Sequence, residues 1–170
     1  MVKYISNSAH YAEVLAHCAD VNRTLWIGTA DIKDAYVDVK GVKVPFLKLL
    51  AQLIGRGVEV RLIHAKEPGP AFREDFDKYP VLYDGLERVL CPRVHFKMIV
   101  FDCREVYVGS ANLTGAGVGM KNENRRNFEA GLLTDDPVIV EQAIAQFDSV
   151  WMGSHCKQCR RREFCADPIK

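Results

Sequence analysis

Hydrophobic and polar residues along the chain follow helical spacing in some segments and strand spacing in others, which predicts a mixture of helices and strands. Apolar residues at helical spacing predict a first helix over 8–20, and a short apolar run over 24–32 is of strand type. A second helical stripe covers 44–57, where Gly55 is the expected C-cap, and 58–65 returns to a strand pattern. A strand, a helix and a strand in this order predict a parallel pair joined by a crossover helix.

The second half of the chain begins with a weak pattern over 67–90, where a turn and one or two short helices are expected. A closing helix is predicted from Asp136, a residue type that caps helices, and its apolar stripe runs to Trp151. Between these segments lie three strand-like runs with short polar links: 93–102, 105–110 and 126–134. The alternation of helices and strands predicts an α/β fold.

The overall composition is that of an ordinary globular protein, with 48% hydrophobic and 26% charged residues in a chain of 170. We expect one catalytic domain over 1–154 and an appended Cys-rich tail over 155–170. The net charge of +1 does not indicate a nucleic-acid binder, although basic residues concentrate at 121–126 and 157–163. Such runs either steer a polyanion or form a solvated loop.

No apolar segment is long enough for a membrane span, and the N-terminus lacks the apolar core of an export signal. A cytoplasmic protein is therefore the expectation. Its six cysteines would then be mostly reduced, as buried thiols or metal ligands.

The segment 95–112, HFKMIVFDCREVYVGSAN, carries polar residues inside a strand pattern. In a strand, residues i and i+2 point the same way, so His95 and Lys97 should share a face. Ser110 and Asn112 repeat this spacing and add a hydroxyl and an amide donor. A neutral imidazole among such cations and donors suits a tetrahedral oxyanion such as phosphate.

Two further residues extend this expected phosphate site. Gly109, which has no side chain, would let the backbone approach the bound anion closely. Glu129, on the third strand-like run, could accept the second imidazole N–H of His95. A carboxylate in that position fixes the imidazole tautomer and stabilises the imidazolium.

The spacing H-x-K-x4-D-x6-G-S-x-N closely resembles the HKD motif of the phospholipase D superfamily. The resemblance extends more weakly to Asn127 and Glu129, and by order of elements it covers 1–152. It implies a phospholipase D-like mixed, mostly parallel sheet flanked by helices, with one HKD half-unit per chain. It also carries Asp102 over as a site residue, although the place of Asp102 at a strand end favours structural support.

Members of this superfamily use two HKD motifs, and this chain has one, so the resemblance implies a homodimer with the active site on its two-fold axis. One His95 would form a phosphohistidine while the other protonates the leaving oxygen. Covalent catalysis of this kind needs one neutral and one protonated imidazole, which a coupled pair can supply. No metal cofactor is expected for catalysis.

The substrate stays open at this stage. Short single-motif members are mostly nucleases, which favours single-stranded DNA or RNA as the substrate. Shortly after the motif follow Lys121, Arg125 and Arg126, which would bind phosphates of that strand. A lipid phosphodiesterase or phosphatidyltransferase would use the same residues. A non-catalytic dimer that binds nucleic acid is the third reading.

Other histidines lack the full motif. His64 and Lys66 also read H-x-K, but no matching Asp or G-S-x-N follows, so His64 is expected to be structural or at the rim of the site. His10 and His17 lie on the first predicted helix and are read as surface or packing residues.

The tail holds Cys156, Cys159 and Cys165 in the spacing C-x2-C-x5-C, with His155 adjacent. Thiolates two residues apart readily bind one metal ion, so a zinc site is the leading interpretation. An iron–sulfur cluster and no metal remain alternatives. The fourth ligand is His155 or, through space, Cys91 or Cys103, whereas Cys18 is read as a core residue.

Overall fold

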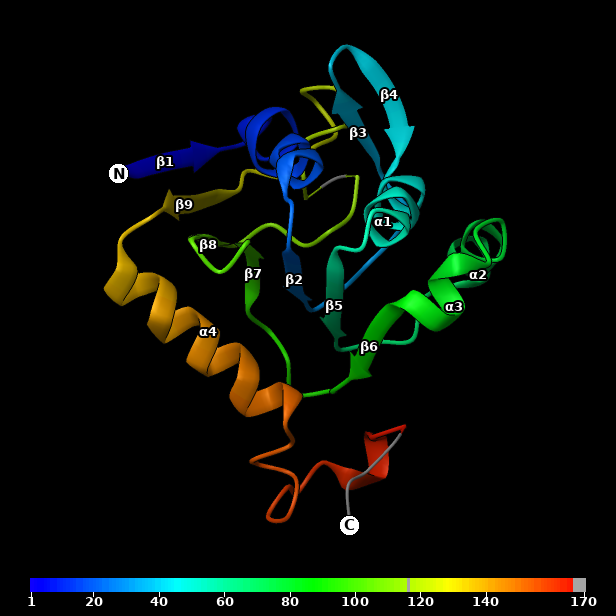
Figure 1. Cartoon of the computed structure of the whole chain (residues 1–170), viewed down its shortest axis with the longest axis vertical. Coiled ribbons are helices and arrows are strands. Elements are labelled where there is room, and N and C mark those ends of the chain that lie inside the picture. The colour runs from blue at the N-terminus through cyan, green and yellow to red at the C-terminus, as the bar shows by residue number, and fades with distance from the viewer. Residues whose placement is uncertain (116, 167–170) are drawn as a thin grey trace.

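The computed structural model describes residues 1–115 and 117–166, and its largest element is a seven-stranded sheet with the strand order β1-β9-β8-β7-β2-β5-β6 (Figure 1). The strands of this sheet are β1 (Val2–Ser6), β2 (Thr24–Thr29), β5 (Glu59–His64), β6 (Leu86–Leu90), β7 (Lys97–Phe101), β8 (Glu105–Gly109) and β9 (Ala130–Thr134). The strands β3 (Tyr36–Val39) and β4 (Val42–Pro45) form a separate hairpin. The α/β fold is thus confirmed.

The pairing pattern corrects one expectation. The strand β2 pairs in parallel with β5, and β5 with β6, so the predicted parallel pair with a crossover helix is confirmed. The other neighbours, from β2 through β7, β8 and β9 to β1, are antiparallel, so the prediction of a mostly parallel sheet was wrong. The physical reason is that β7 and β8 are joined by a short turn, whereas a parallel connection needs a dozen residues or more.

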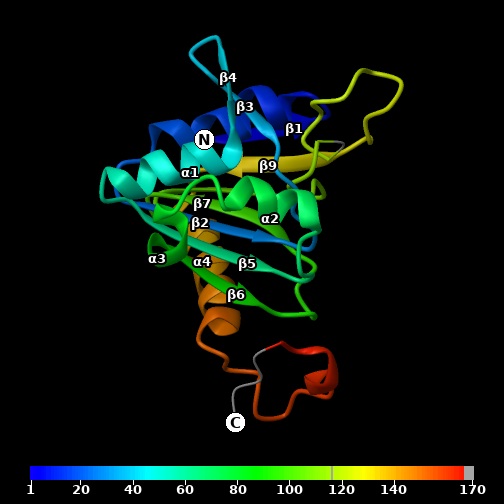
Figure 2. The ribbon, with the colours of Figure 1, turned by 90° about the vertical axis from the view of Figure 1, so that its right-hand side faces the viewer.

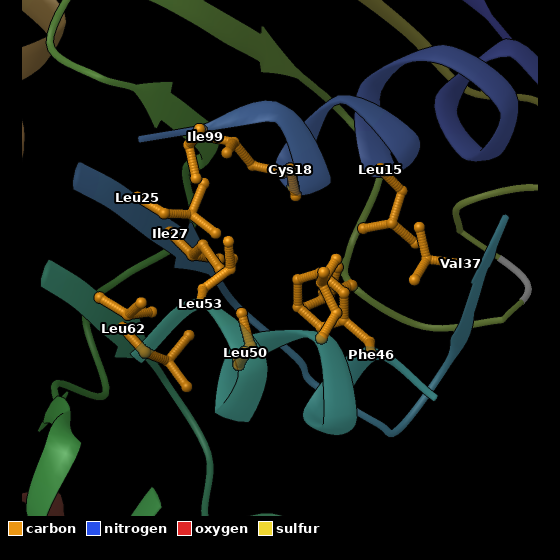
Figure 3. Close-up of a cluster of buried hydrophobic side chains, with 14 of the residues drawn as sticks. Leu15, Cys18, Leu25, Ile27, Val37, Phe46, Leu50, Leu53, Leu62 and Ile99 are labelled. Atoms are coloured by element: carbon orange, nitrogen blue, oxygen red, sulfur yellow. The ribbon is translucent and has the colours of Figure 1, made fainter. Parts of the chain in front are cut away.

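Helices cover both faces of the sheet (Figure 2). The helix α1 (Phe46–Gly55) and the helical segments η1 (His10–Leu15) and η2 (Cys18–Asp20) enclose a large apolar core, in which Leu15, Leu25 and Leu50 are fully buried (Figure 3). The helix α4 (Pro137–Trp151) encloses a second core, where Phe147 stacks on Trp26 at 5.4 Å between ring centroids. The short helices α2 (Pro70–Phe76) and α3 (Val81–Gly85) fill the segment for which short helices were expected.

The first predicted helix is irregular. The segment η1 is π-helical and η2 is a 3₁₀ turn, but both direct their apolar residues to the core as the periodicity required. Four strands were missed by the sequence patterns: β1, β3, β4 and β6. Each is only four or five residues long, so its hydrophobic alternation is weak. In the described part of the chain, no helix is long and apolar enough to cross a membrane.

The end of α1 differs from the prediction that Gly55 is the C-cap. Gly55 is the last helical residue, Arg56 is the C-cap, and Gly57 has the left-handed φ of +86°. The N–H of Gly57 donates to the carbonyl of Ile54, and that of Val58 to the carbonyl of Leu53. These two bonds form a Schellman motif, which requires a residue such as glycine at the position after the cap.

The two glycines should therefore respond oppositely to the same substitution. Gly57→Ala is expected to lower the free energy of unfolding by about 1 kcal/mol, because a Cβ disfavours positive φ. Gly55→Ala is expected to raise it by up to about 1 kcal/mol, because the position is helical and alanine is the better helix former. A Cβ at Gly55 would meet no atom within 4 Å. Urea denaturation of both variants measures the difference, and equal effects would contradict the assignment.

Candidate active site

The motif residues gather at one end of the strands, where β2 and β5 end and β7 begins. We call this end of the sheet the site edge. Lys97 is the first residue of β7 and pairs with Gly109, the last residue of β8, which in turn pairs with Gly131 of β9. His95 lies just before β7 and Ser110 just after β8. The antiparallel pairing of β7, β8 and β9 thus brings segments distant in sequence to one edge.

The side chains of His95 and Lys97 lie together, as the spacing predicted, although His95 precedes the strand. The Nζ atom of Lys97 is 3.3 Å from both ring nitrogens of His95 and donates to the His95 carbonyl at 2.7 Å. Equal distances to the two nitrogens mean that the ammonium is aligned with neither imidazole lone pair. Because His95 is exposed, one nitrogen can reach a substrate beside a fixed cation.

Lys97 is an unusually buried cation, with 7% of its surface exposed. Burial lowers the pKa of its ammonium, and the charge of Glu129 opposes this shift. Beneath it lies a cavity of about 20 Å³ that is also lined by His10 and Tyr107. A partly desolvated ammonium interacts strongly with an anion, because the surrounding dielectric constant is low.

Ser110 and Glu129 form a hydrogen-bond network at the neighbouring strand ends. The Ser110 hydroxyl donates to Glu129 Oε2 and accepts the N–H of Ala130, and Asn127 Nδ2 donates to Glu129 Oε1 at 3.1 Å. The described hydrogen bonds of the Glu129 carboxylate thus go to Ser110 and Asn127, whereas the sequence predicted a bond to His95. The charge of Glu129 still acts on the site, since it opposes the lowering of the Lys97 pKa by burial.

Asn112 is held by two residues that the sequence analysis missed. Its Oδ1 accepts the N–H of Asp31 at 3.2 Å and the hydroxyl of Thr29 at 3.4 Å. Thr29 is buried at the end of β2, and its hydroxyl also accepts the N–H of Leu113. This arrangement leaves the Asn112 amide nitrogen as the donor available to a ligand. A polar residue at the end of a buried parallel strand was the signal that could have identified Thr29.

Gly109 has a packing role, and its predicted contact with an anion stays a prediction. A Cβ built at this position would lie 2.2 Å from the Tyr107 hydroxyl and 2.7 Å from the Ala130 carbonyl. The space that a side chain would need is therefore filled by Tyr107. The glycine is explained by this close approach.

The structure separates Asp102 from the other motif residues. Asp102 follows the far end of β7 from Lys97, roughly 17 Å away at about 3.4 Å per residue of strand. Its carboxylate accepts the backbone N–H groups of Asn22, Arg23 and Thr24 and so clamps the start of β2. This geometry does not support the assignment of Asp102 as a catalytic residue. It supports a structural role for Asp102.

Removing this clamp should cost stability in a pH-dependent way. Burial opposes ionisation of Asp102, but the three backbone donors outweigh it and hold the pKa below the ordinary 3.8. The carboxylate therefore stabilises the fold above that value, and the contribution is lost as the pH falls through the folded-state pKa. Asp102→Asn is expected to lower the free energy of unfolding by about 1–2 kcal/mol near neutral pH. Urea denaturation between about pH 6 and pH 3 should show the gap closing, and a constant gap would indicate a packing effect instead.

The predicted phosphate-binding cations lie on the loop between β8 and β9, which both starts and ends at the site edge (Figure 2). Lys121 and Arg125 are exposed, and Arg126 is half-buried with Glu123 at 3.9 Å. The structure thus places these cations on a loop anchored at the site, without a hydrogen bond or ion pair to the motif residues among the described contacts.

The remaining histidines are accounted for by packing. His64 is fully buried, with Nδ1 2.7 Å from the Lys66 carbonyl, so its structural reading is confirmed. His10 is buried against Tyr107. Burial lowers the pKa of the imidazoles of His10 and His64. The Nε2 atom of His17 is hydrogen-bonded to the Glu105 carboxylate at 2.7 Å, and its ring packs on Phe101.

The cysteines divide into three groups. Cys18 is buried in the core, as predicted, and Cys103 is exposed beside Thr24 at the opposite sheet edge from the site. The other four, Cys91, Cys156, Cys159 and Cys165, border one small cavity. In the described residues, no three His, Cys, Asp or Glu side chains are already positioned to hold one metal ion.

Comparison with known proteins places this geometry in a family. The family described as cardiolipin synthase, PLD-like domain, matches residues 19–151. A search of curated proteins gave no significant match.

Solved structures of similar fold include the phospholipase D family member Nuc from Salmonella typhimurium, with a TM-score of 0.65, 19% identity and coverage of 89% of this chain and 93% of Nuc. NucT from Helicobacter pylori has a TM-score of 0.63 and 16% identity over 88% of this chain and 95% of its own. The archaeal chromatin protein TrmBL2 has a TM-score of 0.59 and 16% identity over 89% of this chain and 52% of its own. Because the family match spans most of the chain and includes the segment from His95 to Asn112, the protein belongs to the phospholipase D superfamily.

Proposed function

We propose that this chain cleaves phosphodiester bonds in single-stranded DNA or RNA, without a catalytic metal ion, at a site completed by a second copy of the chain. Family membership assigns it to the phosphodiesterases of the phospholipase D superfamily. The observation that carries the proposal is the buried Lys97 ammonium 3.3 Å from both nitrogens of an exposed His95. This pair offers a nucleophile and a fixed cation to one phosphate.

The reaction would proceed in two displacements. His95 attacks phosphorus, so a P–N bond forms as the P–O bond to the leaving group breaks, and the partner subunit's His95 gives that oxygen its proton. The same partner imidazole then takes a proton from water, whose oxygen attacks phosphorus and breaks the P–N bond. Lys97 and the Asn112 amide would hold the anionic oxygens in both steps.

Nucleic acid is favoured over lipid by the setting of the site. The edge that carries His95 is open, and the loop of 113–128 that borders it carries the exposed cations Lys121 and Arg125. Cations beside an open site suit a polyanion that extends beyond the reacting phosphate. Among proteins of similar fold, TrmBL2 is described as binding DNA.

A second copy is required because one chain supplies one reactive imidazole. An apolar row lies on the α4 face of the sheet, the face opposite to the Lys97 side chain, and ends at the strand end that carries the site: Tyr4 pairs with Leu132, and Leu132 with Val108, which precedes Gly109. These side chains are 68%, 46% and 41% exposed. A continuous apolar patch beside half a site fits a two-fold contact with another copy of the chain.

A charge in this row should separate the proposed dimer. Leu132→Glu is expected to convert a dimer to a monomer and to abolish cleavage, because two carboxylates would be buried near each other on the two-fold contact. Light scattering after size exclusion measures the mass. Val42→Glu, at an exposed apolar residue of the separate hairpin, is the matched control and should stay dimeric. A Leu132→Glu dimer of wild-type mass would place the interface elsewhere.

The direct test is cleavage of end-labelled single-stranded DNA, single-stranded RNA and duplex DNA in excess EDTA, beside phospholipid vesicles. We expect cleavage of a single-stranded substrate in EDTA and little release of lipid headgroups. Headgroup release without nucleic-acid cleavage would favour the lipid phosphodiesterase. Binding of single-stranded DNA without cleavage, by protein shown to be folded and dimeric, would favour the non-catalytic reading suggested by the likeness to TrmBL2.

A further inference from the structure

The tail and the connection between β6 and β7 meet at one small cavity. The tail lies beyond the end of α4, at the lower end of the molecule in Figure 2. The cavity, of about 30 Å³, is lined by Cys91 and Arg93 from the connection and by residues of the tail. The thiols that border it are Cys91, Cys156, Cys159 and Cys165.

We propose that these four thiolates bind one Zn²⁺ ion, which fastens the C-terminal tail to the segment that carries His95. Four cysteines are a common ligand set of structural zinc, and a C-x2-C pair such as Cys156 and Cys159 readily shares one ion. The fourth ligand, which spacing alone left open, is Cys91 because it borders the same cavity. Each thiol binds as a thiolate and releases its proton.

Of the other two candidate ligands, Cys103 lies elsewhere and His155 lies in an adjoining cavity. Cys103 is 3.5 Å from the hydroxyl of Thr24, at the start of β2, whereas the N–H of Cys91 donates to the carbonyl of His64 at the end of β5. Because β2 and β5 are parallel neighbours, Cys103 and Cys91 lie at opposite ends of the strands. His155 borders an adjoining cavity together with Cys91, Cys156 and Cys159, but it does not border the cavity that all four thiols share, and its Nε2 lies 3.4 Å from the Ser149 hydroxyl.

The surroundings of the four thiols suit an anionic metal centre. Four thiolates on one divalent ion carry a net charge of −2, and the cavity is also bordered by Arg93, Arg161 and Arg162. The N–H of Arg161 donates to Cys159 Sγ at 3.4 Å. Neighbouring cations and N–H donors to sulfur favour the thiolate form that a metal requires.

The cavity that all four thiols border has room for a single metal ion. A volume of about 30 Å³ exceeds the roughly 10–15 Å³ that one water molecule occupies by this measure, so one ion fits with small movements of the side chains. An iron–sulfur cluster adds several iron and sulfide atoms and would need a larger space. Binding would require the half-buried thiols to turn toward each other, since no three described ligands are yet positioned around one point.

Metal analysis of the full chain, purified without chelator, tests the proposal. We expect about one zinc ion per wild-type chain. Cys91→Ser should retain less than a tenth of the wild-type zinc after dialysis against a competing chelator. Cys103→Ser removes one exposed thiol at the opposite edge and should keep the wild-type ratio. Equal zinc in Cys91→Ser and wild type, or no zinc in any protein, would overturn the proposal, as would iron with acid-labile sulfide.

A second measurement on wild-type protein avoids variants that fail to fold. The tail offers trypsin Lys157 and the arginines at 160–162, and a tail fastened by metal should resist cleavage. Mass spectrometry after brief digestion should show an intact tail in zinc-loaded protein. Cleavage at 157–162 should follow removal of zinc by a thiol reagent and a chelator, with the rest of the chain intact. Identical digestion with and without zinc would contradict the proposed fastening.

Discussion

Replacing His95 by Asn is expected to reduce kcat/KM for phosphodiester cleavage by about 10³-fold or more, because it removes both the proposed nucleophile and the proposed proton donor of the pair. The side chain is exposed, and its contacts with Lys97 are local, so the fold should be unaffected. Cleavage of labelled single-stranded DNA and RNA by equal amounts of folded protein measures the loss. His17→Asn, at a histidine that is hydrogen-bonded to Glu105 away from the site, should keep activity close to that of wild type.

The same variant tests whether the site is shared between two chains. If each active site uses both copies of His95, mixed dimers are inactive. After denaturation and random reassembly of equal amounts of wild-type and His95→Asn chains, about a quarter of the dimers are wild type. Activity should therefore fall to about a quarter of that of an all-wild-type sample of the same total concentration. Half of the activity would show that each chain works alone and would contradict the shared site.

Replacing Lys97 by Met is expected to lower kcat/KM by about 10²–10³-fold, the range for loss of one preorganised charge on a reacting anion. The effect should be large because Lys97 is 7% exposed, so water cannot replace its charge easily. Burial disfavours the ammonium, so Met should leave the thermal stability unchanged or raise it. Steady-state cleavage and thermal unfolding of the same samples separate the two effects.

Two further variants show whether Lys97 acts through its shape and place as well as its charge. Lys97→Arg keeps the charge, but the adjoining cavity of about 20 Å³ cannot take the larger guanidinium, so we expect a loss close to that of Lys97→Met. Lys66→Met removes an exposed lysine from the other H-x-K sequence and should leave cleavage unchanged. Full activity of Lys97→Met would remove this residue from the mechanism.

The protonation of Lys97 should also limit the rate at high pH. Because burial lowers the pKa of the ammonium below its ordinary 10.5, the cation is lost at a lower pH than an exposed lysine would be. Cleavage should therefore decline on the alkaline side in wild type. The residual activity of Lys97→Met should lack that decline, and an identical alkaline limb in both would assign it to another group.

Much of the site could be predicted from the sequence, because its parts are local. The side chains of His95 and Lys97 lie together in the structure, as their offset of two residues predicted, even though His95 precedes β7. Asp136 accepts the N–H groups of Val138 and Ile139 and caps α4, as residue type and position indicated. Such features depend on a few neighbouring residues and on backbone geometry that many folds share.

Other features needed the tertiary structure because they depend on contacts between distant segments. The hydroxyl of Tyr107 fills the space beside Gly109, which no spacing rule could show. Glu129 bonds Ser110 because β8 and β9 pair in one particular register. Thr29 supports Asn112 from another strand.

The sequence by itself determined the candidate chemistry of this protein: which residues are proposed to attack, hold and protonate a phosphodiester, and which thiols are proposed to bind a metal. Only the tertiary structure decided which of them meet. It separated Asp102 from His95 by the length of β7, and it brought Cys91 to the tail cysteines while leaving Cys103 at the far edge. The physical reason is that residue type sets reactivity, whereas strand order and register set distance, and chemistry at a site needs both.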